Sequence, residues 1–393
     1  MKVLLNLNSL RPPLSGIGHY SKHIIEGLID SPQISAVAGW LGSEIYRDGD
    51  LKQVIDSGLK VPEAVQFRRD YLSHALRVAR NIPGVYQARS LSRALLSTRA
   101  RSNLSREGYI YHETNFIAAN YNGSSVVTVH DLSHNRFPEF HPKEAIRYLN
   151  RGLPETLRKV RSIITVSQFT KDELVALYDV DEEKVETIHL AAGDDFKVRD
   201  NSECYSVLSA GRLEYKKYIL SVCTLQPRKN LSRLVQAFSA LPDDYRNEFP
   251  LVLIGAKGWM NSSLFQFLQP LVEKGQARVL GYVSQSDIPL FYAGAMLVAY
   301  PSLYEGFGLP IVEGMASGVP VLTSSTSCLP EIAGGAACLV DPNDTEAIIN
   351  GMRMILDDPA YRSALIKAGL ARAAEFKWAN TVAKTVSHYQ RYC

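Results

Sequence analysis

The chain has 393 residues, of which 46% are hydrophobic and 21% are charged, and its formal net charge is +3. This size allows two ordinary hydrophobic cores, so two domains are the default expectation. The charge is too mild for a nucleic-acid binder, and no apolar run approaches the roughly 18 residues of a membrane span. Five scattered cysteines indicate neither a disulfide framework nor a zinc site. The N-terminus reads as a strand rather than a signal peptide, which predicts a cytoplasmic protein.

Short β-branched runs alternate along the chain with longer amphipathic stretches. Such runs are found at residues 3–7, 126–129, 163–166, 218–222, 251–254, 296–300 and 319–322. Strand and helix in alternation predict an α/β fold with parallel sheets, in which ligands bind beyond the carboxyl ends of the strands. A polar segment at 194–217 interrupts the pattern and predicts the linker between two domains.

Gly16 and Gly18 stand between the first predicted strand and a helix-like stretch. Glycines at a strand-to-helix junction allow a phosphate or a sugar to approach the backbone closely. The pair lacks the third glycine of the dinucleotide fingerprint, so an ordinary turn is the alternative interpretation.

The segment 67–108 is strongly basic. It carries nine arginines against only Asp70 and Glu107, a net charge of +7. Apolar residues are interleaved with the arginines, a pattern typical of amphipathic basic helices that lie on an anionic bilayer. We expect this segment to dock the protein on the inner leaflet of the cytoplasmic membrane, with a solvated face of ordinary helices as the alternative.

His130 and Asp131 follow the predicted strand at 126–129. A histidine beside a carboxylate could act as a base with its orienting partner. Adjacent residues of a strand point to opposite faces, however, so we do not expect base catalysis from this pair.

Arg228 and Lys229 come shortly after the predicted strand at 218–222. Asn230 is a plausible N-cap of the next helix, which would place both cations at the mouth of a cleft. Two cations and helix N–H donors could neutralise a departing nucleoside diphosphate without a metal. Two solvated cations in a loop are the alternative.

Glu305 and Glu313 bracket a Gly-Phe-Gly-Leu-Pro loop that follows the apolar run 296–300. The glycines allow tight backbone geometry and the proline suits a first helical turn, so the segment predicts a strand end, a loop and a helix start. Free N–H groups at a helix start bind phosphate. Both carboxylates could then face one ligand, Glu305 toward sugar hydroxyls and Glu313 toward a ribose.

Residues 301–310 and 316–321 resemble the retaining glycosyltransferases of family 4, whose hallmark is two glutamates separated by seven residues around such a loop. The resemblance implies the GT-B architecture, in which two Rossmann-like domains face each other across a cleft. The N-terminal, acceptor-binding domain would span 1–200 and the C-terminal, nucleotide-sugar-binding domain 201–375. A helix at 376–393 would cross back onto the N-terminal domain.

The resemblance also implies roles for single residues. Lys229 matches the diphosphate lysine of the family, and we expect Arg228 to replace the basic residue that many relatives carry where this chain has Thr224. The catalytic residues would be His130, Glu305, Lys229 and Arg228, with His130 on the donor sugar and the leaving phosphate taking the acceptor proton. The donor-binding residues would be Gly16, Gly18, Tyr282, Gly306, Phe307, Gly308, Leu309 and Glu313.

The implied reaction is metal-independent, retaining transfer of a hexose, mannose from GDP-mannose. The acceptor would be a polyisoprenyl-diphosphate-linked saccharide of O-antigen or related polysaccharide synthesis, because residues 137–142 resemble a loop of bacterial O-antigen mannosyltransferases. No further cofactor and no nucleic-acid partner are expected. The alternatives are a UDP-sugar donor, a nucleotide-sugar 2-epimerase and a non-catalytic scaffold of the assembly machinery.

Overall fold

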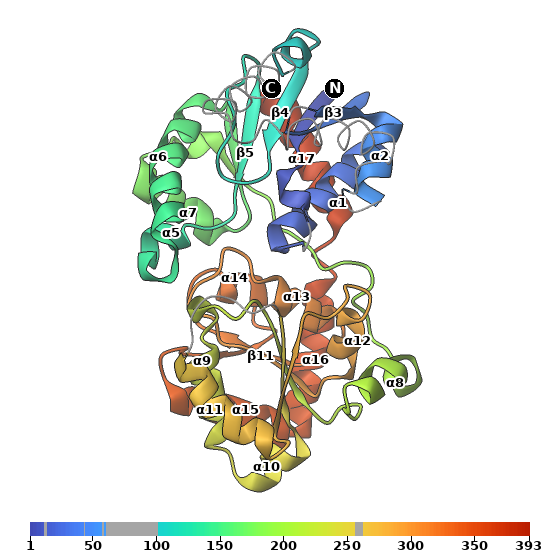
Figure 1. Ribbon diagram of the computed structural model, residues 1–393, viewed down its shortest axis with the longest axis vertical. Coiled ribbons are helices and arrows are strands. Elements are labelled where there is room, and N and C mark those ends of the chain that lie inside the picture. The colour runs from blue at the N-terminus through green and yellow to red at the C-terminus, as the bar shows by residue number, and fades with distance from the viewer. Residues whose placement is uncertain (12–13, 43, 57–58, 60–100, 256–261) are drawn as a thin grey trace, which may run out of the picture.

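A computed structural model describes residues 1–11, 14–42, 44–56, 59, 101–255 and 262–393. It contains two α/β units, one above the other along the long axis in Figure 1. Within the described residues, no helix is both long and apolar enough to cross a bilayer.

The N-terminal unit is built on a seven-stranded sheet with the order β3-β2-β1-β4-β5-β6-β7. Its strands are β1 (Lys2–Asn6), β2 (Ala36–Leu41), β3 (Glu44–Arg47), β4 (Tyr109–Glu113), β5 (Ser125–Val129), β6 (Ser162–Thr165) and β7 (Val185–Thr187). Neighbouring strands are parallel except for β2 and β3. Strand β5 is buried along its whole length, which explains its continuous rather than alternating apolar pattern.

Helices and short 3-10 segments connect these strands. They are η1 (Asn8–Leu10), α1 (Gly16–Asp30), α2 (Asp48–Asp56), α5 (Ser133–Arg136), η3 (Pro138–Phe140), α6 (Lys143–Lys159), α7 (Gln168–Tyr178) and η4 (Glu182–Lys184). Helix α7 begins after Ser167, whose side chain accepts a hydrogen bond from the Thr170 N–H group.

The C-terminal unit has a six-stranded parallel sheet with the order β10-β9-β8-β11-β12-β13. Its strands are β8 (Ile219–Val222), β9 (Leu251–Ile254), β10 (Ala277–Gly281), β11 (Leu297–Tyr300), β12 (Val321–Ser324) and β13 (Cys338–Val340). Counted from β8, this is the strand order of the doubly wound nucleotide-binding fold. Its order reverses between β8 and β11, so ligands are expected beyond the carboxyl ends of these two strands.

The helices of this unit lie on both faces of its sheet (Figure 1). They are α8 (Asn201–Ala210), η5 (Pro227–Lys229), α9 (Leu231–Ser239), α10 (Asp243–Glu248), α11 (Ser262–Glu273), α12 (Ile288–Gly294), α13 (Leu309–Ala316), α14 (Leu329–Ala333), α15 (Thr345–Asp357) and α16 (Pro359–Ala373).

All seven predicted strands are present, with small shifts at their ends. The largest shift is at β12, which begins at Val321 because Pro320 has no N–H group for the sheet. The predicted linker at 194–217 is wrong in its middle, because α8 forms at 201–210 and packs on α12. Asp200 and Glu203 form a capping box at its start, a local signal that the polar composition obscured.

The last helix, α17 (Trp378–Tyr392), lies beside α1 in the N-terminal unit, where Figure 1 shows it in red next to blue. Its Tyr389 hydroxyl lies 2.6 Å from Nδ1 of the buried His112, whose Nε2 lies 2.8 Å from the Thr128 hydroxyl. These partners satisfy the buried hydroxyl of Tyr389 and both ring nitrogens of His112. The chain therefore crosses between the two units twice, as the resemblance to GT-B proteins implied.

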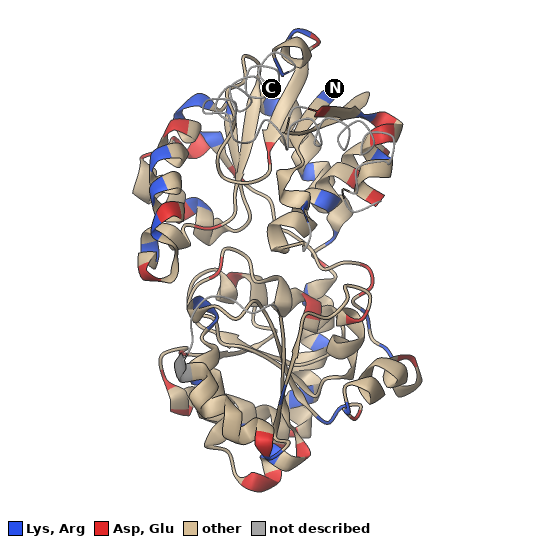
Figure 2. Cartoon of the chain, viewed as in Figure 1, with Lys and Arg blue, Asp and Glu red and all other residues tan. Residues whose placement is uncertain are grey.

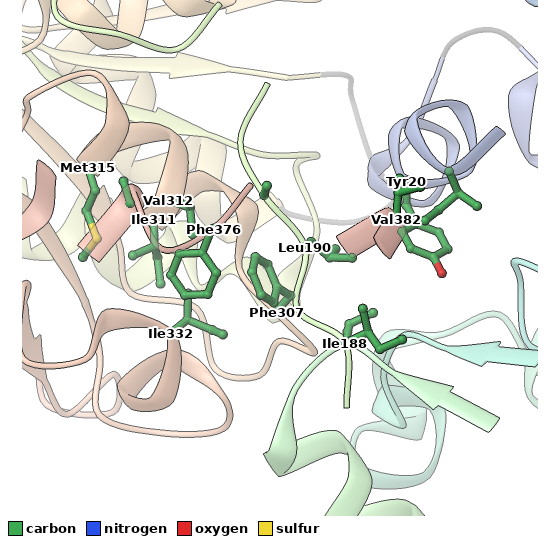
Figure 3. Close-up of a cluster of buried hydrophobic side chains, with 14 of the residues drawn as sticks. Tyr20, Ile188, Leu190, Phe307, Ile311, Val312, Met315, Ile332, Phe376 and Val382 are labelled. Atoms are coloured by element: carbon green, nitrogen blue, oxygen red, sulfur yellow. The ribbon is translucent and has the colours of Figure 1, made fainter. Parts of the chain in front are cut away.

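A hydrophobic cluster is continuous between the units. Figure 3 shows it running from Ile332 and Phe376 through Phe307 and Leu190 to Val382 on α17. The rings of Phe307 and Phe376 are 5.7 Å apart and nearly perpendicular. This cluster fixes the place where the chain passes from one unit to the other.

The contact between α1 and α17 depends on a small residue. A Cβ atom added at Gly27 would lie 2.3 Å from Cγ2 of Val382. We expect Gly27→Ala to lower the free energy of unfolding by about 1–3 kcal/mol, measured by urea unfolding, because overpacking forces the helices apart. In a Val382→Ala background the same change should be neutral or stabilising by up to about 1 kcal/mol, since alanine favours helix. A fully stable Gly27→Ala protein would contradict this packing.

Candidate functional site

Glu305 is the centre of a charged cluster in the loop after β11. Its carboxylate accepts hydrogen bonds from Arg228 Nη1 (2.7 Å), Lys229 Nζ (2.6 Å), the Tyr300 hydroxyl (2.7 Å) and the Ser302 hydroxyl (2.6 Å). Only 8% of the side chain is exposed. Burial alone would raise the pKa of Glu305, but the two cations outweigh this effect and lower the pKa to about 2. Glu305 is therefore ionised at neutral pH, and its charge is balanced by Arg228 and Lys229 in the loop after β8.

Arg228 and Lys229 lie on η5, directly beyond the carboxyl end of β8. Nη1 of Arg228 also donates to the Tyr304 carbonyl (2.9 Å), and Nζ of Lys229 donates to the Tyr300 hydroxyl (2.8 Å). The structure thus brings Arg228, Lys229 and Glu305 together at the point where the strand order reverses.

The cap predicted for α9 is different in the structure. Asn230 occupies the N-cap position, but its backbone is left-handed and its side chain does not cap the helix. Instead, its amide donates to the carbonyls of Pro301 (3.0 Å) and Pro342 (2.7 Å). Asn230 therefore ties the loop of the two cations to the loop that carries Glu305, a long-range contact that no local pattern reveals.

Two glycines shape the Glu305 loop for different reasons. A Cβ atom added at Gly306 would lie 1.7 Å from the carbonyl oxygen of His130, so only glycine permits this contact between the units. Gly308 has φ +89° and precedes α13, a backbone conformation that glycine adopts without strain. Leu309 then begins α13 and is half-buried.

Glu313 lies one turn inside α13, close to the hydroxyl of Tyr292. Burial raises the pKa of Glu313 to about 7, and the Tyr292 hydroxyl offsets this only in part. Among the residues that the structure describes, no cation balances Glu313 as Arg228 and Lys229 balance Glu305, so the two glutamates differ in charge state near neutral pH.

His130 comes from the N-terminal unit at the end of β5. Its Nε2 lies 2.7 Å from the Thr114 carbonyl oxygen, and burial lowers its pKa. A carbonyl only accepts, so Nε2–H must donate, and Nδ1 of the neutral ring is left as an acceptor. Asp131 has separate partners, the N–H group and hydroxyl of Ser133 at 2.9 and 2.7 Å.

Several predicted donor residues lie apart from this cluster. Phe307 is buried against Phe376 and His189, so its ring belongs to the cluster between the units. Tyr282 is 62% exposed at the end of β10. Gly18 packs against η1, where an added Cβ would lie 2.7 Å from the Ser9 carbonyl oxygen, whereas Gly16 has open space around it.

Sequence reasoning missed the tyrosines and the serine around Glu305. Tyr300 reads as the last apolar residue of a strand, yet its hydroxyl bridges Lys229 and Glu305. Tyr304 reaches into the N-terminal unit, where its hydroxyl donates to Glu173 and accepts from the Leu132 N–H group (3.1 Å). No local signal distinguishes these hydroxyls from those of ordinary core tyrosines.

Most of the basic segment 67–108 lies outside the described residues, which resume at 101. Arg101 is buried, with its guanidinium 4.7 Å from the Trp40 ring, so its assignment to a membrane-facing surface was wrong. Cations of the described N-terminal unit are interspersed with acidic residues along α6, as Figure 2 shows, and Lys159 there pairs with Glu155.

Metal ligands and disulfides were not expected from the sequence. Within the part of the chain that the structure describes, no three His, Cys, Asp or Glu side chains are grouped as a metal site would require. The five cysteines are free.

Comparisons with known proteins agree with this geometry. The family model described as "Glycosyl transferases group 1" matches residues 209–372, and "Glycosyltransferase Family 4" matches residues 69–192. The chain is 34% identical to the O-antigen chain mannosyltransferase B of Escherichia coli over 392 residues, 99% of this chain and 100% of that protein. It is 27% identical to the O-antigen chain mannosyltransferase RfbU of Salmonella typhimurium over 57% of this chain and 58% of that protein.

A solved structure, HepE of Anabaena in complex with UDP and glucose, is similar to the whole chain. The TM-score is 0.70 at 18% identity, with 100% of both chains covered, which shows a common fold. The two units, their crossing helix and the end-to-end sequence similarity lead to one conclusion: the chain belongs to the family 4 glycosyltransferases and has the GT-B fold.

Proposed function

We propose that this glycosyltransferase moves mannose from GDP-mannose, with retention of configuration, to a polyisoprenyl-diphosphate-linked saccharide in O-antigen or related polysaccharide synthesis. The observation that carries the proposal is the similarity to the E. coli O-antigen chain mannosyltransferase B, which extends over both units. Retention, metal independence and the lipid-linked acceptor follow from the family resemblance.

The charged cluster suits the departure of a nucleoside diphosphate. As the bond from C1 to the phosphate oxygen breaks, negative charge grows on the diphosphate. Arg228 and Lys229 are held in place by Glu305 before any ligand arrives, so little reorganisation is needed to stabilise that charge. The N–H groups at the start of α13 add further donors. Arg228 takes the place of the basic residue that many relatives carry where this chain has Thr224.

The acceptor hydroxyl would attack C1 as that bond breaks, and its proton would pass to the departing phosphate oxygen. Glu305, being ionised, would accept a hydrogen bond from a sugar hydroxyl at Oε2, the oxygen to which Arg228 donates. His130, with Nδ1 as an acceptor, would bind another hydroxyl of the same sugar. No side chain then needs to act as nucleophile or base.

A UDP-sugar donor is the second candidate, since HepE, with the same fold, has been crystallised with UDP and glucose. We assign the acceptor to the N-terminal unit, and contact with an anionic membrane to residues 67–100, which lie outside the described residues.

The donor can be tested by thermal shift with GDP, UDP, ADP and their common sugar conjugates, without metal. A ligand of the native state raises the free energy of unfolding by RT ln(1 + [L]/Kd), and therefore raises the unfolding temperature. We expect a selective shift with GDP and GDP-mannose. A shift with UDP conjugates alone would overturn the donor, and no shift with any nucleotide would favour a non-catalytic scaffold.

Lys229→Ala and Glu305→Ala should each reduce turnover by about 100-fold or more, roughly 2.7 kcal/mol of transition-state stabilisation. Lys229→Ala removes a diphosphate ligand, whereas Glu305→Ala removes the carboxylate that holds both cations. The measurement is the initial rate of mannose transfer at saturating donor. Lys217→Ala is a matched control, because Lys217 pairs with Glu248 on the surface. Near-wild-type rates in both test variants would contradict the assignment.

Glu313 should make nucleotide binding depend on pH. Its pKa of about 7 lies above the ordinary value of 4.5, and ribose hydroxyls that donate to the ionised form would lower it. Binding should therefore release a proton near pH 7, and affinity should rise with pH until about 7 and then level off. Calorimetry in buffers of different ionisation enthalpy measures this release. Glu313→Gln should abolish it, and unchanged release in that variant would exclude Glu313 as the source.

Folding stability should respond to the same group with the opposite sign. Because the folded-state pKa is raised, the stabilising contribution of Glu313 is fully present below about pH 4.5 and is lost as pH rises through about 7. Buried Glu113 also has a pKa raised to about 7, so unfolding experiments alone would not separate the two carboxyl groups.

A further inference from the structure

A carboxylate of the C-terminal unit caps a helix of the N-terminal unit. Oε1 of Glu331, on α14, accepts from the Gln168 N–H group (2.9 Å), and Oε2 accepts from the Phe169 N–H group (3.0 Å). Both N–H groups belong to the first turn of α7, where a helix leaves its donors without internal partners. A negative charge is also favourable at this end of the helix dipole.

A third donor completes the same contact. Nε2 of His189, just after β7, lies 2.8 Å from Oε1 of Glu331. Burial alone would raise the pKa of Glu331, but His189 and the two backbone N–H groups outweigh this effect and hold the pKa below its ordinary value. Glu331 is therefore ionised at neutral pH, and each of its oxygens is bonded to the opposite unit.

The backbone of Glu331 is fixed within its own unit. Arg372, on α16, donates from Nη2 to the Glu331 carbonyl (2.7 Å) and from Nε to the Ile332 carbonyl (3.0 Å). In the same segment, the Ser327 hydroxyl accepts from the Glu305 N–H group (3.2 Å). The segment 327–331, whose Glu331 caps α7, therefore also binds the backbone of the loop that carries Glu305.

Helix α7 in turn contacts the Glu305 loop. The Thr170 hydroxyl donates to the Gly306 carbonyl (3.4 Å), and Glu173 accepts from the Tyr304 hydroxyl. Gly306 lies against the carbonyl of His130. The orientation of α7 therefore sets how His130 meets the Glu305 loop, which we call the donor loop.

We propose that Glu331 is a positioning residue of the transfer reaction. By holding the N-terminus of α7 together with His189, it keeps the N-terminal unit closed on the donor loop, so that His130 reaches the sugar at Glu305. Glu331 touches no substrate in this assignment. The kinetic consequence rests on the proposed sugar transfer, whereas the effect on closure rests on geometry alone.

A pair of variants at the start of α7 isolates this contact. Gln168→Pro removes the N–H group that donates to Glu331, and proline is well tolerated at the first position of a helix. Ser167 has the extended backbone that a following proline requires. Gln168→Ala is the control, because it removes the same side chain, with its contacts to Asp172 and Thr187, but keeps the N–H group.

Glu331→Ala is the second test variant, on the other unit, and Glu346→Gln, an exposed glutamate in the first turn of α15, is its control. Small-angle X-ray scattering of the ligand-free, full-length proteins measures closure. We expect a larger radius of gyration for Gln168→Pro and Glu331→Ala than for the wild type and both controls. Thermal unfolding checks that every variant is folded.

Kinetics should separate positioning from binding. We expect kcat with GDP-mannose to fall about 10-fold or more in both test variants, equivalent to about 1.4 kcal/mol. The affinity for GDP should change less than about twofold, since Arg228, Lys229 and Glu313 all lie in the C-terminal unit. An inactive wild type would count against the transferase proposal, while scattering would still test closure.

Two outcomes would overturn the assignment of Glu331. The first is wild-type scattering from both test variants. The second is an expanded form that keeps the kcat of the Gln168→Ala control, which would show that closure does not position His130.

Discussion

The buried contact of Glu305 with Arg228 and Lys229 is the interaction on which the site depends. Removing a carboxylate from water is unfavourable unless cations and hydrogen-bond donors replace the solvent. Here two cations and two hydroxyls do so, at 2.6–2.7 Å. Loss of Glu305 would leave two buried cations without their carboxylate, and an uncompensated buried charge typically costs about 3–5 kcal/mol. The two loops are therefore held together by their own side chains.

Sheet topology explains why these three residues meet. Strands β8 and β11 are neighbours and parallel, so the loops after them leave the sheet at the same edge, although about 70 residues separate them in the chain. Asn230 and Ser302 then join the loops through backbone carbonyls. The cations are thus oriented by the fold before a diphosphate approaches, which is how an electrostatic site acts with little reorganisation.

The N-terminal unit completes the site from the opposite side. His130 reaches the donor loop only because Gly306 has no Cβ atom. Tyr304 and Glu331, both of the C-terminal unit, bind the N-terminal unit through residues of α7. The crossing helix α17 and the cluster around Phe307 limit how the units move relative to each other. The Glu305 loop, the start of α7 and the crossing helix α17 together therefore set the position of the His130 ring.

The α/β fold, seven of its strands and the Glu305 loop could be predicted from the amino-acid sequence, because these depend on local periodicity, on glycine geometry and on a short motif. The sequence also identified Arg228, Lys229 and Glu313 as the charged residues around that loop. It misassigned Asn230, α8 and Arg101, where a long-range carbonyl contact, a capping box and a tryptophan ring decided the outcome.

The pairing of polar groups that are distant in the chain, in contrast, depends on how the fold brings them together. Tyr300, Tyr304 and Glu331 have no distinguishing sequence context, yet their partners lie between 5 and 172 residues away. The charge states of the two motif glutamates are also tertiary properties. Within the described part of the chain, Glu305 has cations beside it and Glu313 has none, so the pKa of Glu305 falls to about 2 while that of Glu313 rises to about 7. A spacing of residues cannot encode that difference, because it arises from which side chains the fold brings to each carboxylate.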